Sequence, residues 1–161
     1  MKKLALIGLV AVLAMTACGD DTEPTSTATS PSPTLTSSPS PTQSASETVN
    51  VASSSLGQIL VDAEGRTLYL FMRDSGGKSS CTEGCAQTWP PLAASGTPTA
   101  GEGVQQSLLG TTQRDDGSMQ VVYNQHPLYH FSGDSAAGQT NGQGVGGNWF
   151  VVSPAGEPIR S

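Results

Sequence analysis

Two copies of one short pattern stand sixty residues apart in this sequence: L-Y-L-F-M-R-D at residues 68–74 and L-Y-H-F-S-G-D at residues 128–134. Both copies read L-Y-x-F-x-x-D. Successive side chains of a strand point to opposite faces, so Tyr69 and Phe71 are expected on one face and Leu68 on the other. The second copy repeats this arrangement with its own tyrosine and phenylalanine. The pattern therefore predicts two sister strands that share one hydrophobic interior.

Each copy ends in an aspartate, where glycine begins to appear in the sequence. The simplest interpretation is that each aspartate accepts backbone N–H bonds in the turn that ends the strand. A second interpretation stays open, in which tyrosine and aspartate form a pair that binds a ligand or a metal. The motif residues to which both interpretations apply are Tyr69, Phe71, Asp74, Tyr129, Phe131 and Asp134.

The surrounding sequence favours a small, mostly β domain with antiparallel strands, built from two related repeats at about 56–77 and 119–138. β-branched and aromatic residues alternate between turn residues, which is typical of short strands. Strands are predicted at 49–53, 58–62, 67–72, 107–114, 119–123, 128–131 and 148–152. Upstream of the motif, Val61 and Val121 also fall in register. One short helical turn is predicted at 82–88, ended by Pro90-Pro91.

The first seventeen residues have the layout of a secretory signal peptide: Lys2-Lys3, an apolar run at 4–14, and small residues before Cys18. The apolar run is too short to cross a membrane, which takes about 20 residues. The segment Met15-Thr16-Ala17-Cys18 resembles the bacterial lipobox, although leucine is usual where Met15 stands. This resemblance implies a lipid attached to Cys18, which would anchor the mature chain stably to the membrane.

Residues 18–47 are predicted to form a disordered tether, because twenty of the twenty-five residues at 22–46 are Ser, Thr or Pro. Such a segment buries too little apolar surface to offset its ordering entropy. The domain is expected at 48–161, on the extracytoplasmic face of the cell membrane. The formal charge of −6 repels nucleic acid, so nucleic acid is not expected as a partner.

Cys81 and Cys85 are expected to form a structural disulfide, because an exported protein is oxidised and residues i and i+4 of a helical turn lie near bonding distance. A redox-active pair stays an alternative, although such pairs are usually spaced C-x-x-C. Copper or haem binding through these cysteines or through His126, His130 and Met72 is a further alternative. No cofactor is predicted.

Known catalytic patterns are absent from the sequence, which has no G-x-S-x-G elbow and no H-E-x-x-H segment. Asp74 and Asp134 could act as a carboxylate pair only if the fold brought them together. We therefore expect a protein that is not an enzyme. The expected role is a non-catalytic binding or scaffolding module of the cell envelope, with a membrane, an envelope protein or a small ligand as partner.

Several segments between residues 56 and 153 together resemble a known family. They are the two repeats, C-T-E-G-C-A at 81–86, W-P-P-L at 89–92 and N-G-Q-G at 141–144 before Trp149. The chain resembles the bacterial predicted lipoproteins with a repeated Y-x-[FWY]-x-x-D motif, also called the secreted repeat of unknown function. The resemblance implies the fold and an exported location, but no reaction or ligand. Gln125 departs from the family, which has a turn glycine there, so a different turn type is expected.

Overall fold

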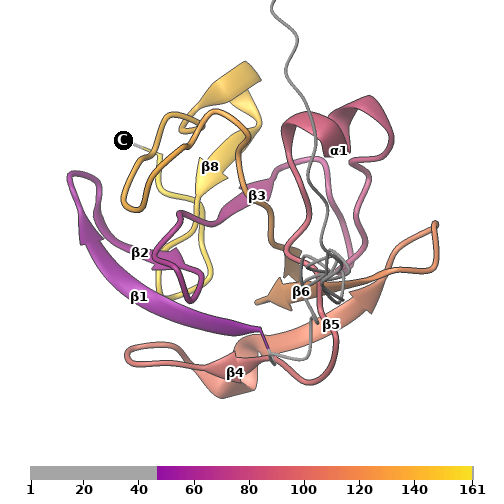
Figure 1. Cartoon of the computed structure of the whole chain (residues 1–161), viewed down its shortest axis with the longest axis horizontal. Coiled ribbons are helices and arrows are strands. Elements are labelled where there is room, and N and C mark those ends of the chain that lie inside the picture. The colour runs from indigo at the N-terminus through magenta and orange to yellow at the C-terminus, as the bar shows by residue number, and fades with distance from the viewer. Residues whose placement is uncertain (1–46, 161) are drawn as a thin grey trace, which may run out of the picture. The chain divides into compact units, whose positions relative to one another are not determined.

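The computed structural model describes residues 47–160; the predicted signal peptide, Cys18 and the tether up to residue 46 lie outside the described residues. Short strands joined by long loops make up this part of the chain (Figure 1). The strands are β1 (Thr48–Ser54), β2 (Gly57–Val61), β3 (Tyr69–Phe71), β4 (Thr99–Ala100), β5 (Leu109–Gln113), β6 (Met119–Tyr123), β7 (His126–Pro127) and β8 (Trp149–Val151). The helical segments are α1 (Gly84–Thr88) and the 3-10 turns η1 (Gln106–Leu108) and η2 (Val145–Gly147). Among these described elements, no helix is long and apolar enough to cross a membrane.

The strands form three small sheets, ordered β2-β1-β4, β3-β8 and β5-β6-β7. All named pairs are antiparallel except β1 with β4, which run parallel over two residue pairs. The predicted fold class is confirmed: a mostly β domain of two repeats with one short helix beside Cys81 and Cys85. The parallel strand β4 was not among the predicted strands.

The two motif segments lie side by side at the centre of the domain. The backbone N–H of Tyr69 donates to the carbonyl oxygen of Tyr129 at 2.9 Å, and the N–H of Tyr129 donates back to Tyr69 at 3.0 Å. These reciprocal bonds relate the two repeats by an approximate two-fold axis.

Each repeat then gives its tryptophan-containing segment to the other repeat. β8, which follows the second repeat in the chain, pairs with β3 of the first, and the Trp89–Leu92 segment, which follows the first repeat, pairs with Tyr129 of the second. Equivalent bonds recur at both places. Met72 N–H donates to the Asn148 carbonyl as Ser132 N–H donates to the Thr88 carbonyl. The repeats are therefore intertwined and are not two separate modules.

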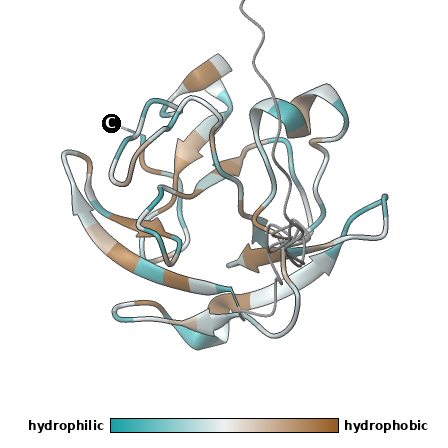
Figure 2. Cartoon of the chain, viewed as in Figure 1, coloured by the Kyte–Doolittle hydropathy of each residue, from teal (hydrophilic) through white to brown (hydrophobic). Residues whose placement is uncertain are grey.

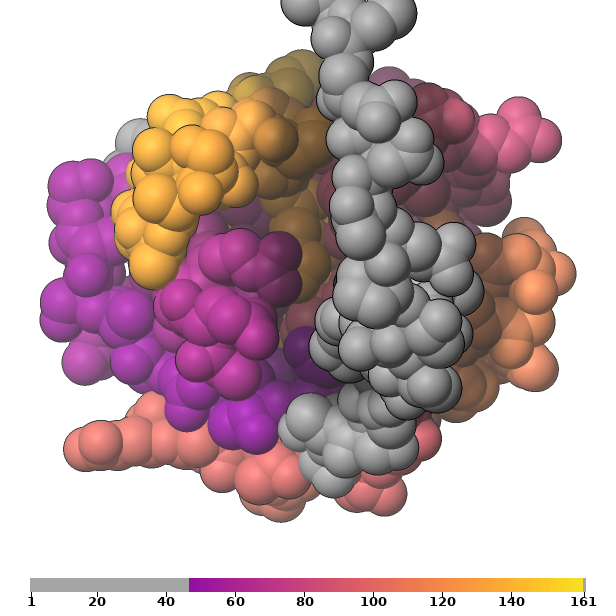
Figure 3. Space-filling view, in the orientation of Figure 1, coloured from indigo at the N-terminus to yellow at the C-terminus, as the bar shows by residue number. Residues whose placement is uncertain are grey.

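The surface shows the same interlocking. In the space-filling view the magenta turn after β2 lies against the orange loop of the second repeat (Figure 3). Gly138 N–H donates to the carbonyl of Gly65 at 3.1 Å, and the Thr67 hydroxyl donates to the Gln139 carbonyl at 2.6 Å.

The strands bury two hydrophobic clusters, because their alternating side chains point to opposite faces. The first, called the leucine core, comprises Val49, Leu60, Leu68, Leu70, Leu92, Val121, Tyr123, Leu128 and Val152. The second, called the aromatic core, comprises Ile59, Val61, Tyr69, Cys81, Trp89, Tyr129, Trp149 and Val151, with Phe71 and Phe131 packed against it. Hydrophobic residues accordingly gather on the central strands, and the outer loops are mostly polar (Figure 2). The predicted alternation within the motif is confirmed.

The predicted strand at 128–131 is wrong, because Tyr129 makes only isolated bridges there. The opposing segment contains Pro90 and Pro91, which have no N–H to donate, so a continuous ladder cannot form. In the sister position β8 supplies these N–H groups, and β3 is a true strand.

The predicted register of Val61 with Val121 is also wrong, since the sister of Val121 is Leu60. Leu60 N–H donates to the carbonyl of Val152, and Val121 N–H donates to the carbonyl of Leu92. The turn after β2 is one residue longer than the turn after β6, which shifts the upstream alignment by one.

The β6–β7 turn keeps a left-handed conformation without glycine. Asn124 and Gln125 have φ values of 48° and 64°, as the two central residues of a type I′ turn require. The turn therefore has the positive φ values that glycine adopts easily, and the different turn type expected from Gln125 is not found.

Candidate functional site

The tyrosine and the aspartate of each motif bond to the other motif. The Tyr69 hydroxyl donates to Asp134 Oδ2 at 2.6 Å, and the Tyr129 hydroxyl donates to Asp74 Oδ2 at 2.6 Å. The second oxygen of each carboxylate accepts a backbone N–H, from Ser80 to Asp74 and from Asn141 to Asp134. The backbone donors lie six and seven residues beyond the aspartates, so these bonds hold the following loops and not only the turn that ends the strand.

Burial raises the pKa of both motif tyrosines above the ordinary value, and the hydrogen bond to the facing aspartate raises it further. Both hydroxyls therefore stay protonated and act as donors. Since each carboxylate has donors on both oxygens, the motif works as a pair of internal cross-links between the repeats.

Four aromatic rings form a row across the approximate two-fold axis. Trp89 and Trp149 stack with centroids 3.9 Å apart and planes within 2°. Phe71 stacks on Trp149 at 4.2 Å, and Phe131 lies on Trp89 at 4.5 Å. Gly142 closes over this row, because a Cβ there would lie 2.8 Å from the Trp89 ring. The central contact between the repeats is thus buried and tightly packed.

Cys81 and Cys85 form a disulfide, with Cα atoms 5.2 Å apart, as predicted. Cys81 is fully buried in the aromatic core, while Cys85 is partly exposed at the start of α1. The bond therefore fixes α1 to the core.

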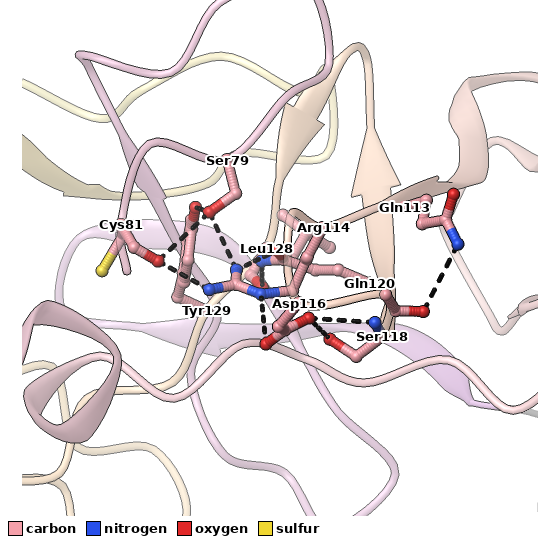
Figure 4. A network of polar contacts seen from close by, with 10 residues as sticks. Ser79, Cys81, Gln113, Arg114, Asp116, Ser118, Gln120, Leu128 and Tyr129 are labelled. Carbon is pink, nitrogen blue, oxygen red and sulfur yellow. Dashed lines mark hydrogen bonds and ion pairs between the residues drawn. The ribbon is translucent and has the colours of Figure 1, made fainter. Parts of the chain in front are cut away.

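A buried arginine lies beside the loop 79–89, which contains the disulfide and is called the disulfide loop. Arg114, directly after β5, is only 7% exposed. Its Nη1 donates to the Ser79 hydroxyl at 2.8 Å and to Gln120 Oε1 at 2.6 Å, and its Nη2 donates to the Cys81 carbonyl at 2.6 Å (Figure 4). Ser79 is also bonded to the Tyr129 hydroxyl, so the network continues into the motif.

Arg114 forms the floor of a cleft of about 510 Å³ between the disulfide loop and the β5–β6 turn. The cleft is lined by Ser79, Thr82, Glu83, Ala86, Arg114, Asp115 and Asp116. Arg114 Nε is buried and has no hydrogen-bond partner in the described residues; the Asp116 carboxylate lies 3.9 Å away. Hydrogen bonds from Ser118 lower the pKa of Asp116, so this rim carboxylate is ionised at neutral pH. The cleft thus combines one buried cation with an acidic rim.

The histidines and Met72 lie in separate surroundings. His130 Nε2 is 3.6 Å from Asp62 Oδ2, and burial lowers the pKa of His130, so its ring is neutral at neutral pH. His126 belongs to β7, and exposed Met72 contacts Arg160. Residues 47–160 contain no cluster of three or more His, Cys, Asp or Glu side chains that could hold a metal.

Sequence reasoning missed Arg114, Gln120 and Ser79. One signal was available: an arginine at the end of a predicted strand, directly before two aspartates, is unusual in a chain with few basic residues. The partners of this arginine come from positions far apart in the sequence, so no local pattern could have named them.

A search of curated proteins and a search of solved structures found no match. A family model described as "secreted repeat of unknown function" (Lipoprotein_15) matches residues 50–93 and 110–153. These two matched segments coincide with the two intertwined repeats and cover more than half of the chain, so the protein belongs to this family of secreted repeats.

Proposed function

We propose that the protein is a lipid-anchored, non-catalytic binding module on the extracytoplasmic face of the cell membrane, and that the Arg114 cleft is its binding site. Membership of a family of secreted repeats supports the exported location. The lipobox-like segment that ends at Cys18 supports the anchor.

The observation that carries this proposal is the contrast between the motif and the cleft. The tyrosines and aspartates of the motif are fully bonded to each other, so they have a structural role. Around Arg114, by contrast, a mostly buried guanidinium and exposed carboxylates line a concave surface. Concave surfaces with a few convergent polar groups are where proteins usually bind ligands.

Binding is tested by placing a photo-reactive residue at Thr82, in the cleft, and at exposed Ala136 as the control. Irradiation of intact cells should give a covalent adduct with an envelope component from position 82 only. No adduct at 82, or equal adducts at both positions, argues against the cleft as the binding site.

The anchor is tested separately by incorporation of labelled palmitate. Labelling and membrane association should be lost in Cys18→Ala. A Cys18→Ala protein that still carries the label would contradict lipid attachment at this residue.

A further inference from the structure

We infer that the cleft binds an extended peptide segment carrying lysine or arginine side chains. This inference names the ligand class for the site proposed above and rests on that proposal. The approximate two-fold symmetry relates the cleft to an equivalent region elsewhere in the domain.

The two places can be matched residue by residue. We call the β5–β6 hairpin with the loop 79–89 the cleft half, and the β1–β2 hairpin with the loop 141–148 the closed half. Glu83 precedes α1 with a φ of 46°, and Gly144 precedes η2 with a φ of 73°, so Thr82 and Gln143 are sister residues. By the hydrogen bonds of the tryptophan segments, Pro91 is the sister of Val151.

In the closed half, an extended segment of the chain itself occupies this place. Ile159 packs against the aromatic core, its N–H donates to the Val151 carbonyl at 2.9 Å, and its carbonyl accepts from Gln143 Nε2 at 2.6 Å. A bridge between Val152 and Pro158 aligns this tail with β8 (Figure 1). The tail thus shows how a peptide backbone fits between a strand and the loop beside it.

In the cleft half, the described residues include no such segment. Arg114 lies at the bottom of the space, where its guanidinium already donates to Ser79, Gln120 and Cys81. Thr82, the sister of Gln143, lines the space and carries a hydroxyl donor where the Gln143 amide binds the tail carbonyl in the closed half. The lining therefore suits a chain with free backbone carbonyl groups.

The charge of the residues that line the cleft determines which side chains a bound peptide can carry. Glu83, Asp115 and Asp116 place three carboxylates around the single guanidinium of Arg114. The excess negative charge disfavours an acidic ligand and favours a basic one.

The test uses an acetylated and amidated peptide of alternating Lys and Thr, of roughly eight residues, since an extended chain rises about 3.3 Å per residue. Binding to the purified domain is followed by fluorescence anisotropy and by NMR shift mapping. We expect a dissociation constant on the order of 10–100 μM, with shifts at the cleft residues. A Glu-Thr peptide of the same length should bind at least tenfold more weakly.

Two variants separate the cleft from general charge attraction. The rim variant Glu83→Gln/Asp115→Asn/Asp116→Asn should weaken binding about tenfold. The matched variant Glu47→Gln/Glu102→Gln/Glu157→Gln removes the same charge elsewhere and should change binding less than about twofold. Ala86→Trp fills the cleft without changing charge and should abolish binding.

Equal weakening by the rim and matched variants, or unchanged binding by Ala86→Trp, overturns the inference. If position 82 cross-links in cells while the Lys-Thr peptide does not bind, the ligand class is wrong but the binding module stands. If neither occurs, both proposals fail.

Discussion

The closed half and the cleft half have the same backbone arrangement, but different side chains are packed inside them. In the closed half, Ile59 is buried in the aromatic core and Ile159 covers it. In the cleft half, the sister of Ile59 is Gln120, which is equally buried but is hydrogen-bonded to Arg114. One repeat position is therefore apolar in one half and polar in the other.

This difference shows where an intertwined duplication can change. At the centre, the tyrosine–aspartate cross-link is made twice with equal length, and the single tryptophan stack takes one ring from each repeat. The outer ends differ: the chain's own tail covers the closed half, and the cleft half is open. Function is expected at the place where the symmetry is broken.

The largest effect is expected at the symmetric centre. Trp89→Ala and Trp149→Ala should each lower the free energy of unfolding by about 3–5 kcal/mol, because each removes a buried ring from the stack. Urea unfolding measures this loss. The two losses should agree within about 1 kcal/mol, and the double variant should lose less than their sum, since the rings contact each other. A large loss at one tryptophan with almost none at the other would contradict the two-fold arrangement.

The next largest effect is expected at Arg114 and Gln120, where the two halves differ. Arg114→Met should cost about 2–4 kcal/mol, because Gln120 Oε1 and the Cys81 carbonyl lose their donor. Adding Gln120→Ile copies the apolar residue of the closed half and should recover at least about 1 kcal/mol. Chemical unfolding of the single and double variants measures both values. A double variant less stable than Arg114→Met would show that the apolar residue of the closed half cannot replace Gln120 in the cleft half.

The two cross-links should contribute alike. Tyr69→Phe and Tyr129→Phe should each cost about 1–3 kcal/mol, because each hydroxyl bonds the facing aspartate and one further group. The further group is the Gly142 N–H for Tyr69 and the Ser79 hydroxyl for Tyr129. Since folding raises the pKa of both tyrosines, the native stability is full below pH of about 10 and falls as the pH rises further. Unfolding curves measured from pH 8 to pH 11 should show a weaker decline in the double variant. An identical decline would contradict the assigned shift.

The disulfide exists only in the cleft half. Cys81→Ala/Cys85→Ala should cost about 2 kcal/mol by the chain-entropy estimate for so small a loop. Amide hydrogen exchange should become faster in residues 79–89, while the loop 141–148 of the closed half serves as the internal control. Faster exchange in both loops would show that the bond stabilises the whole domain and not the cleft.

The smallest expected effect is an increase in the free energy of unfolding. Gln125→Gly should raise stability by about 0.5–1 kcal/mol, because φ at this residue is 64° and glycine adopts this conformation without strain. The turn after β2 already has a glycine, Gly65, with a φ of 80°. Thermal unfolding of Gln125→Gly and Gly65→Ala should give shifts of opposite direction. A destabilised Gln125→Gly protein would mean that the glutamine side chain has a role of its own.

Much of the domain could be predicted from local sequence. The alternation in L-Y-x-F-x-x-D placed Leu68 and Tyr69 on opposite faces, and the C-x3-C spacing indicated the disulfide. Strands with two-residue periodicity and a bond over one helical turn depend on neighbouring residues only. The strand at 128–131 failed because the prolines that interrupt it lie in a distant segment.

The sequence by itself determined the repeat, the alternating faces and the disulfide, because periodicity and short spacings are local properties of the chain. Only the tertiary structure decided that Tyr69 bonds to Asp134 and not to its own Asp74, and that Arg114 lies under a cleft. These contacts join residues that are far apart in the chain, and they follow from the exchange of segments across the two-fold axis. Two equal motifs carry no local signal that tells which aspartate belongs to which tyrosine.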